Sequence, residues 1–564
     1  MPTKSLTGAD VIVEVLREEG VEILFGIPGG VLVPLFDRLY HEFVSGRLRH
    51  ILTRHEQGAA HMADGYARAT GKVGVCIATS GPGALNLVTG LATANMDSVP
   101  VVALTGQVKR EMIGKDAFQE ADIRGVTMPI TKHNYLVKDP DALGDALREA
   151  FHLARSGRPG AVLVDIPVDV TTSPAQLLPR GESALRGHEP PSAPDPELIR
   201  QAAALLNASE RPVLFVGGGA ISSGASEALR QLAEKAGIPV AHSLMGKGAF
   251  PESSPLSLGM PGMHGTAYAS RALHHADLIL GVGVRFDDRV TSDPSKFAPL
   301  AAIVHIDIDA AELNKVVTPT VGIAGDARVV LEQLLPLVKK GRRRAWDEQV
   351  LEWKRQCPLR YPVPEHGLAP QFVIEELWRV TGGQALVTTE VGQHQMWAAQ
   401  YYRVDRPRQF LTSGGLGTMG YGLPAAIGAQ LGCPDAVVWD IAGDGSIQMN
   451  MQEITTAAIH KLPVKVAILN NGYLGMVRQW QELFYGRRYS GVDLSGNPDF
   501  PALARACGGE GFTVTEPEEV GPALERAMAI DDRPVLVDFR VTPEANVTPM
   551  IPGGKSVEDV IMEA

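Results

Sequence analysis

An aspartate between two glycines follows a buried apolar run in the last third of the chain. The run is 436–442, the turn is Gly443-Asp444-Gly445-Ser446, and a second apolar run at 464–469 ends at Asn470-Asn471. We interpret the runs as parallel strands joined by a helix at about 450–460, so both strand tips meet at one sheet edge. Carboxylate, amide and carbonyl oxygens suit Mg²⁺, and a glycine turn before a helix suits phosphate. Two ordinary tight turns are the alternative, but the asparagine pair favours a metal-diphosphate site.

This pattern resembles the diphosphate-binding motif of thiamine-diphosphate enzymes. The resemblance implies that Mg²⁺ is held by Asp444, Asn471 and the main-chain carbonyl of Tyr473. It also implies that Met419 is the bulky residue that keeps the cofactor bent. The implied contacts of thiamine diphosphate are Gly392, Gln393, His394, Met419, Gly443, Gly445, Ser446 and Met476.

A glutamate stands just past another buried strand, at the start of a helix rich in small residues. Taken alone, Glu56 near a helix N-terminus is most simply a solvated cap. The segment Arg54–Arg68, however, resembles the family's RHEQGAAHMADGYAR sequence, in which this glutamate bonds the aminopyrimidine ring and activates the cofactor. A zinc-protease HExxH motif is excluded because Ala59 stands where histidine is needed.

Two glycine clusters fail the test for a dinucleotide-binding motif. Gly217-Gly218-Gly219 is followed by Ser222 where the third glycine is required, and Gly281-Val282-Gly283 is followed by Phe286. Glycine turns after strands still bind anions, so a phosphate-bearing ligand in this part of the chain stays possible.

Several further segments resemble one branch of the superfamily, the acetohydroxyacid synthases. The segments are Lys115–Glu120, Thr131–Asn134, Met263–Gly265, Arg285–Arg289, His305–Asp309, Gly414–Gly422 and Met476–Trp480. The resemblance implies a bound FAD without a redox role. Its implied contacts are Gly217, Gly218, Gly219, His264, Arg285, Asp307 and Asp326.

The activity implied by this resemblance is decarboxylation of pyruvate and transfer of the two-carbon unit to pyruvate or 2-ketobutyrate, in valine, leucine and isoleucine biosynthesis. The implied site residues are Glu56, Gln119, Lys132, Arg289, Trp480 and Gly30. Arg289 would bind the acceptor carboxylate, and Trp480 would form an apolar wall favouring 2-ketobutyrate. Gln119 and Lys132 would line the substrate region, and Gly30 would donate from its backbone. The alternatives are a surface pair of Arg289 with Asp287 or Asp288 and an ordinary core role for Trp480.

Other branches of the superfamily remain as alternatives. They are pyruvate oxidase, sulfoacetaldehyde acetyltransferase and glyoxylate carboligase. Glyoxylate carboligase lacks the activating glutamate, so Glu56 argues against it. A non-catalytic cofactor-binding subunit is the alternative of another class, and the presence of Glu56 with Asp444 and Asn471 disfavours it.

The elements that would position these residues predict three doubly wound parallel-sheet α/β domains. Thr7 to Asp10 fits a capping box, and the strand that ends at Asp538 has the same pattern as the one that ends at Asp165, as expected if the first and third domains share a fold. The expected organisation is a pyrimidine-binding domain at 1–180, a linker at 181–196, a central FAD-binding domain at 197–340, a linker at 341–366, a diphosphate-binding domain at 367–541 and a tail over the active site at 542–564.

The composition fits an ordinary globular enzyme. The chain has 564 residues, 45% apolar and 21% charged, with a net charge of −12. The acidic balance argues against nucleic-acid binding, and no apolar run is long enough for a membrane span. Four scattered cysteines without CxxC spacing favour a reducing cytoplasm. By resemblance we expect a homodimer or homotetramer, with a possible regulatory small subunit.

Two positions depart from the resemblance. Acetohydroxyacid synthases commonly have alanine and proline where this chain has Val31 and Lys109. By resemblance both positions line the channel in which sulfonylurea and imidazolinone herbicides bind. Added bulk at Val31 and a hydrated charge at Lys109 predict weak sensitivity to these herbicides, unless Lys109 turns outward to solvent.

Overall fold

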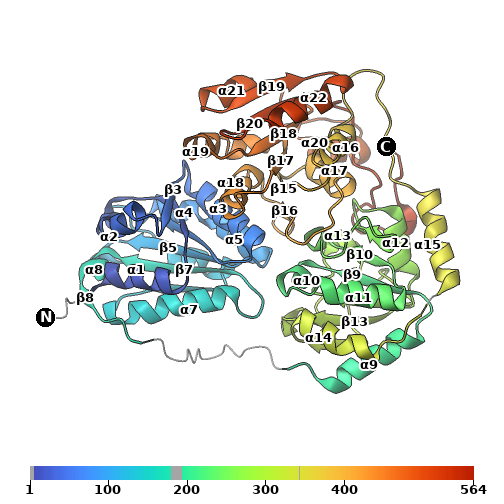
Figure 1. Ribbon diagram of the computed structural model, residues 1–564, viewed down its shortest axis with the longest axis horizontal. Coiled ribbons are helices and arrows are strands. Elements are labelled where there is room, and N and C mark those ends of the chain that lie inside the picture. The colour runs from blue at the N-terminus through green and yellow to red at the C-terminus, as the bar shows by residue number, and fades with distance from the viewer. Residues whose placement is uncertain (1–5, 180–192, 342, 564) are drawn as a thin grey trace.

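A computed structural model describes residues 6–179, 193–341 and 343–563. Most of the linker predicted at 181–196 lies outside these residues. Within them, the chain forms three six-stranded sheets whose neighbouring strands are all parallel (Figure 1). This confirms the predicted class of three doubly wound α/β domains, while the exact domain boundaries stay predictions.

The first sheet is covered by helices on both faces. Its strands, in spatial order, are β3 (Arg49–Leu52), β2 (Ile23–Ile27), β4 (Gly74–Ala78), β5 (Val101–Gln107), β7 (Ala161–Pro167) and β6 (His133–Leu136). One face packs on α1 (Gly8–Glu18), α2 (Val33–Val44) and α7 (Leu143–Arg155), and the other on α3 (Glu56–Thr70) and α5 (Val88–Met96). Adjacent residues such as Leu24 and Phe25 therefore enter opposite cores, which explains the unbroken apolar runs.

Short elements complete this domain. The predicted capping box at Thr7 and Asp10 is present at the start of α1. β1 (Leu6–Thr7) pairs antiparallel with β8 (Pro174–Ala175). The remaining helices are α4 (Pro82–Asn86), α6 (Ile123–Thr127) and α8 (Val168–Thr172).

The central sheet has the strand order of dinucleotide-binding folds. The order is β11 (Ser257–Gly259), β10 (Val240–His242), β9 (Pro212–Val216), β12 (Leu278–Val282), β13 (Ala302–Asp307) and β14 (Val321–Ala324). In chain order this is 3-2-1-4-5-6, although the glycine motif of those folds is missing from the sequence. Its helices are α9 (Pro196–Ala208), α10 (Gly218–Ser222), α11 (Ser226–Ala236), α12 (Ala267–His275), α13 (Asp288–Thr291) and α14 (Ala327–Leu334).

The segment expected as a second linker at 341–366 differs from that expectation. It contains α15 (Arg344–Gln356), which runs along the edge of the central domain (Figure 1). Trp346 and Val350 are buried against this domain, and the Trp346 indole donates to the carbonyl of Pro212 at 3.2 Å. The charged residues of the segment form the exposed side of the helix. Because they dominate the segment, its narrow apolar side did not indicate a helix in the sequence.

The third sheet repeats the topology of the first. Its order is β16 (Phe410–Thr412), β15 (Leu386–Thr389), β17 (Val438–Gly443), β18 (Lys465–Asn470), β20 (Val535–Arg540) and β19 (Glu510–Val514). Both sheets have the chain order 2-1-3-4-6-5, in agreement with the sequence similarity between their ends. The helices are α16 (Pro370–Val380), α17 (Gln393–Tyr401), α18 (Gly422–Gly432), α19 (Glu453–Ile459), α20 (Gly475–Phe484), α21 (Phe500–Ala506) and α22 (Pro517–Met528).

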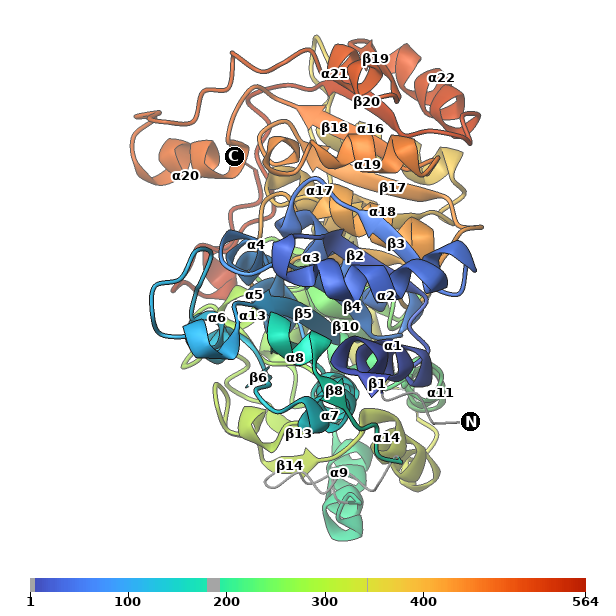
Figure 2. The ribbon, with the colours of Figure 1, turned by 90° about the vertical axis from the view of Figure 1, so that its left-hand side faces the viewer.

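Helices α3 and α18 join the first and third domains (Figures 1 and 2). A Cβ on Gly65 would lie 2.2 Å from the carbonyl oxygen of Ala425, and one on Gly428 would lie 2.0 Å from that of Met62. The two backbones therefore touch.

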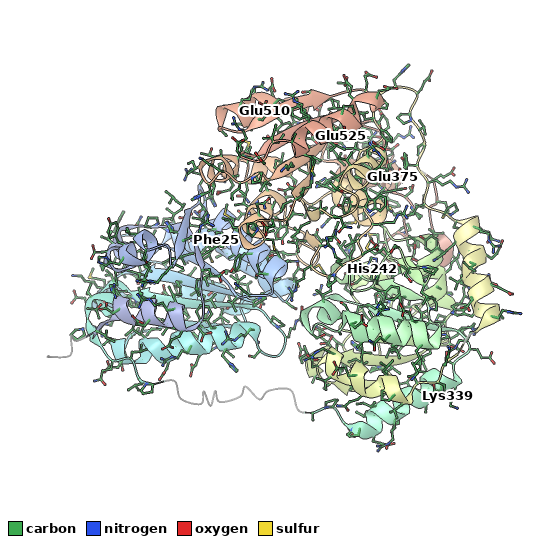
Figure 3. All side chains as sticks on the ribbon, in the orientation of Figure 1. Phe25, His242, Lys339, Glu375, Glu510 and Glu525 are labelled. Atoms are coloured by element: carbon green, nitrogen blue, oxygen red, sulfur yellow. The ribbon has the colours of Figure 1, made fainter. Side chains whose placement is uncertain are left out.

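A buried charged cluster joins the central and third domains. Glu252 accepts hydrogen bonds from His242 at 2.8 Å, from Lys247 at 2.6 Å and from the backbone N–H of Val404 at 2.6 Å. Figure 3 places His242 where these two domains meet. Although burial opposes the charged form, the Lys247 ammonium and the hydrogen bond with His242 lower the pKa of this carboxylate to about 2.

Candidate active site

The carboxyl ends of β15, β17 and β18 bring the predicted diphosphate residues together. A Cβ on Gly443 would lie 2.5 Å from Nδ1 of His394, so the imidazole ring covers that glycine. Asn471 donates through Nδ2 to Oε1 of Gln393 at 3.2 Å. A Cβ on Gly475 would lie 2.1 Å from the same Oε1 atom. This edge includes the point between β15 and β17 where the strand order reverses, the usual ligand position in such sheets.

Asp444 is buried at this edge. One of its carboxylate oxygens accepts a hydrogen bond from Asn497 Nδ2 at 2.7 Å, and burial raises its pKa to about 6. Oδ1 of Asn471 accepts from the N–H of Tyr473 at 3.1 Å, which fixes these two of the three predicted ligands relative to one another. A buried carboxylate bonded to a neutral amide fits a divalent cation. In the described chain no cluster of three His, Cys, Asp or Glu residues suits a metal, and the predicted ligand set needs only one carboxylate.

Met419 lies over the aspartate turn. Its Cε is 3.9 Å from the position that a Cβ would take on Gly445. The next segment along this edge, α20, stands off the side of the third domain (Figure 2) and carries Met476 and Trp480. Trp480 is partly exposed and packs edge-on against Phe484 at 5.5 Å between ring centroids, so it is not the core residue of the alternative interpretation.

The C-terminal tail is fastened to α20. Gln479 donates to the carbonyl of Val547 at 3.0 Å and accepts from its N–H at 2.8 Å. Farther along, the N–H of Ile551 donates to the carbonyl of Met263 at 2.8 Å. The tail therefore connects α20 to the central domain, beside the predicted acceptor residues.

The Ser446 hydroxyl is used within the protein. It donates to Glu390 at 2.7 Å and accepts from the N–H groups of Gly420 and Val391 at 3.2 and 3.3 Å. The predicted contact of Ser446 with the cofactor stays a prediction.

Glu56 is the first residue of α3 and is only 8% exposed. Asn86 donates to its Oε2 at 2.9 Å, and a Cβ on Gly83 would lie 3.2 Å from its Oε1. Glu453 of α19 accepts from the N–H groups of Arg54 and His55, both at 3.0 Å. The third domain thus fixes the turn that presents Glu56.

Gln119 lies close to this turn. Its φ of 60° is in the left-handed region, and its carbonyl oxygen is 2.7 Å from the position of a Cβ on Gly81, just before α4. Because α4 carries Asn86, Gln119 and Glu56 share one supporting helix. Gly30 opens a short 3₁₀ helix at Gly30–Leu32, with no atom within 4 Å of where its Cβ would be.

Lys132 and Arg289 make other contacts in this single chain. The Lys132 ammonium donates to the carbonyls of Leu153 and Ser156 at the end of α7, and burial lowers its pKa to about 8. Arg289 pairs with Asp288 at 2.9 Å and is largely exposed, which is the surface pair left open as an alternative. Among the described residues, neither side chain hydrogen-bonds to Glu56 or Asp444, so their substrate roles stay predictions.

A cavity of about 560 Å³ lies between the first, central and third domains. It opens at the ends of β9 and β12, the switch point of the central sheet. Five of the predicted FAD residues line it, namely Gly218, Gly219, Arg285, Asp307 and Asp326. Arg158 and Arg408 add cationic groups suited to phosphates. Its size and charge fit a phosphate-bearing ligand as large as FAD.

Two predicted FAD residues do not line this cavity. Gly217 is explained by packing, because a Cβ there would lie 2.1 Å from the carbonyl oxygen of Gly283. His264 is buried, and burial lowers its pKa to about 4. Their contact with a flavin stays a prediction.

Val31 and Lys109, the two residues that depart from the family resemblance, lie in different surroundings. Cγ2 of Val31 is 2.5 Å from where a Cβ on Gly106 would lie, so Val31 packs tightly on β5. Lys109 is exposed beside a surface hollow of about 630 Å³ that also contains Arg110 and Asp169. In this chain Lys109 adopts the outward position left open as the alternative.

Sequence reasoning missed the partners of the predicted residues. These are Asn86, Glu390, Glu453 and Asn497. Glu390 had a signal, since it directly follows the β-branched residues that end β15. No sequence pattern indicated Asn497, because it lies in an irregular loop and reaches Asp444 only through the tertiary fold.

Family comparisons agree with this geometry. Residues 6–126, 199–334 and 390–539 match the N-terminal TPP-binding, central and C-terminal TPP-binding domains of thiamine pyrophosphate enzymes. No described helix has the length and apolar character needed to span a membrane.

Full-length relatives agree as well. The chain is 52% identical to the acetolactate synthase large subunit of Corynebacterium glutamicum, covering 98% of this chain and 90% of that protein. It is 50% identical to an acetolactate synthase of Mycobacterium bovis, covering 99% and 91%. It is 47% identical to the isozyme 3 large subunit of Escherichia coli, covering 97% of each. The chain therefore belongs to the acetolactate synthase large-subunit family of thiamine pyrophosphate enzymes.

Proposed function

We propose that this chain is the catalytic subunit of an acetolactate synthase. It decarboxylates pyruvate and joins the remaining two-carbon unit to the ketone of a second 2-keto acid, pyruvate or 2-ketobutyrate, in branched-chain amino acid biosynthesis. The observation that carries the proposal is the convergence of Gln393, Met419, Asp444 and Asn471 at one sheet edge, in a chain that also presents a buried Glu56.

We assign the metal and diphosphate to this edge. Asp444, Asn471 and the Tyr473 carbonyl hold Mg²⁺, and the glycine turn receives the diphosphate. Thiamine diphosphate, when bound, supplies the carbon nucleophile that adds to the keto acid and stabilises the charge left by decarboxylation. Asn497 keeps the Asp444 carboxylate oriented without neutralising its charge.

Glu56 is assigned to the ring nitrogen of the aminopyrimidine. Asn86 fixes the position of Oε2, and Oε1 faces Gly83, where a side chain would crowd it. The carboxylate therefore presents a fixed charge that favours the ring tautomer able to accept a proton. Glu453 keeps the preceding backbone in place by accepting two of its N–H groups.

The acceptor keto acid is assigned to Arg289 and Trp480. The guanidinium suits a carboxylate because it can donate two parallel hydrogen bonds, and its exposure leaves room to exchange Asp288 for substrate. Trp480 supplies the apolar wall that contacts the methyl or ethyl group. Gly30, Gln119 and Lys132 are proposed to complete the substrate region.

FAD is assigned to the cavity of about 560 Å³, with Arg285 and Asp326 among its walls, and without a redox role. We further propose a homodimer or homotetramer. The exposed Phe118, 87% accessible, and Met128, 60% accessible, support burial by another subunit. The large-subunit name of the relatives supports a regulatory small subunit as partner.

The test is incubation of the purified chain with pyruvate, thiamine diphosphate, Mg²⁺ and FAD, followed by assay for acetolactate. Acetolactate formation that depends on thiamine diphosphate and Mg²⁺ is expected, with the flavin staying oxidised. Bleaching of the flavin by pyruvate without oxygen would show an oxidase instead. Absence of both CO₂ release and product would show a non-catalytic subunit.

A further inference from the structure

Glu390 is a buried carboxylate that touches three segments of the cofactor edge. It stands at the end of β15 and is fully buried. Its Oε2 accepts from the Ser446 hydroxyl and from the N–H of Gly420, both at 2.7 Å. Its Oε1 accepts from the N–H of Leu423 at 3.2 Å, in the first turn of α18. Glu390 itself directly precedes the segment 391–394.

A second buried acid lies on the neighbouring strand. Asp440 of β17 is fully buried and pairs in register with Thr388, whose hydroxyl donates to its Oδ1 at 3.1 Å. Its Oδ2 has no hydrogen-bond partner among the described residues. A Cβ on Gly422 would lie 2.2 Å from Asp440 Oδ1 and 2.7 Å from the backbone nitrogen of Glu390, so the Asp440 carboxyl group and the Glu390 backbone both lie against this glycine.

The surroundings decide which acid carries the proton. Burial raises the pKa of both carboxyl groups, and the pKa of Asp440 lies well above its usual range also because Glu390 is near. Two adjacent buried carboxylates cannot both be ionised. Glu390 accepts three hydrogen bonds and faces the N-terminus of α18, which favours its charged form. Asp440 has a carboxyl oxygen without a hydrogen-bond partner. Burying that oxygen without a partner costs much less free energy when the acid is neutral than when it is charged.

We propose that Glu390 is a positioning residue of the cofactor site, kept charged because Asp440 holds the proton. Its carboxylate links Gly420, the residue after Met419, to Ser446, the last residue of the glycine turn at 443–446. Met419 thereby keeps a fixed distance from that turn, which is what a cofactor held bent between them requires. This inference rests on the proposed function, because it assumes that both segments contact thiamine diphosphate.

The geometry predicts an asymmetry between two isosteric changes. Glu390→Gln places an NH₂ group against an N–H or hydroxyl donor, so at least one of the three bonds is lost. Asp440→Asn replaces one neutral group with another and is the matched control on the adjacent strand. Glu390→Asp keeps the charge but is one methylene too short to reach both the loop and the helix.

The experiment measures binding of thiamine diphosphate in the presence of Mg²⁺ by tryptophan fluorescence, together with steady-state kinetics of the full chain loaded with FAD. For Glu390→Gln we expect at least a tenfold rise in Kd and in the apparent KM for thiamine diphosphate. KM for pyruvate should stay within twofold. For Asp440→Asn, both values should stay within about twofold of the unmodified chain, and Glu390→Asp should lie between the two.

Several outcomes would overturn the inference. They are wild-type affinity in Glu390→Gln, or an equal loss of affinity in Asp440→Asn, which would show that Asp440 carries the charge. If Glu390→Gln does not fold, wild-type affinity in Glu390→Asp overturns it and a measurable loss supports it. Failure of the unmodified chain to bind thiamine diphosphate would instead refute the proposed function, so the two failures are distinguishable.

Discussion

The two carboxylates proposed to carry the chemistry are each held by an asparagine. Asn86 donates to Glu56 at 2.9 Å, and Asn497 donates to Asp444 at 2.7 Å. An amide orients a carboxylate without cancelling its charge, whereas an arginine or lysine would compete with the ring nitrogen or the metal ion. The choice of partner therefore keeps both charges available for ligands.

Glu56→Gln keeps the shape of this side chain and removes its charge. We expect a fall in kcat of at least about 100-fold, the usual range for a lost acid–base group, while the Kd of thiamine diphosphate changes little. Steady-state kinetics and fluorescence titration measure the two quantities. Glu14→Gln, in the distant α1, is the control and should leave both unchanged. Wild-type turnover of Glu56→Gln would mean that another group activates the cofactor.

Trp480→Leu should change acceptor choice without abolishing acetolactate formation. The indole is partly exposed on α20, so shortening it enlarges the acceptor pocket only. A hydrophobic contact with one methylene is worth roughly 1–3 kcal/mol, or about 10–200-fold in selectivity. Competition between pyruvate and 2-ketobutyrate in one tube measures the product ratio. An unchanged ratio would remove Trp480 from the acceptor site.

At the scale of elements, the contact of α3 with α18 decides whether Glu56 is presented correctly. The two helices meet backbone to backbone because Gly65 and Gly428 have no side chains. This contact fixes α3 against the third domain. The Glu453 carboxylate of α19 also accepts hydrogen bonds from the backbone just before α3. The first residue of α3 is therefore positioned relative to the third domain.

Gly65→Ala tests this contact. Its Cβ would lie 2.2 Å from a backbone oxygen, so the helices must separate. Overpacking of this kind costs about 1–3 kcal/mol, and we expect a lower Tm with reduced kcat. Gly322→Ala in β14 is the control, because its nearest neighbours would be 3.5 Å away. Equal Tm values for the two variants would show that α3 and α18 tolerate separation.

At the scale of the whole molecule, each sheet has a reversal of strand order, the usual position for ligands in such sheets. The reversals lie between β2 and β4, β9 and β12, and β15 and β17. The first carries the glycine turn before Gly30, the second opens into the large cavity, and the third carries the aspartate turn. Ligands bound at these edges contact several elements at once and therefore stabilise the folded chain.

Removal of thiamine diphosphate and Mg²⁺ should lower Tm. A ligand that binds only the folded state contributes about 2.7 kcal/mol at one hundred times its Kd. Asp444→Ala should lose this dependence on the cofactor, while its Tm without cofactor stays near that of the unmodified chain. Thermal scans with and without cofactor and a chelator provide the comparison. A cofactor-dependent shift that survives in Asp444→Ala would exclude Asp444 as a metal ligand.

The sequence by itself predicted the fold class, which the structure confirms, and the candidate site residues, whose roles stay predictions. Apolar runs with glycine turns specify buried parallel strands, and the resemblance of local segments identified Glu56, Asp444 and Asn471. These signals are short in range, because a turn, a strand tip and a helix start are each encoded within a few residues. Helix α15 was not predicted because its apolar side is narrow and becomes buried only against the central domain.

Only the tertiary structure determined which side chains hydrogen-bond to the predicted site residues. Asn497 reaches Asp444, Asn86 reaches Glu56, and Glu453 reaches the turn before Glu56, across separations of 53, 30 and nearly 400 residues. It also showed the Lys132 ammonium fastening the end of α7 and the Ser446 hydroxyl bonded to Glu390. Most of these pairs form within one domain, and the Glu453 pair joins the third domain to the first. The protonation of the Glu390 and Asp440 pair depends on burial, which no local pattern of residues encodes.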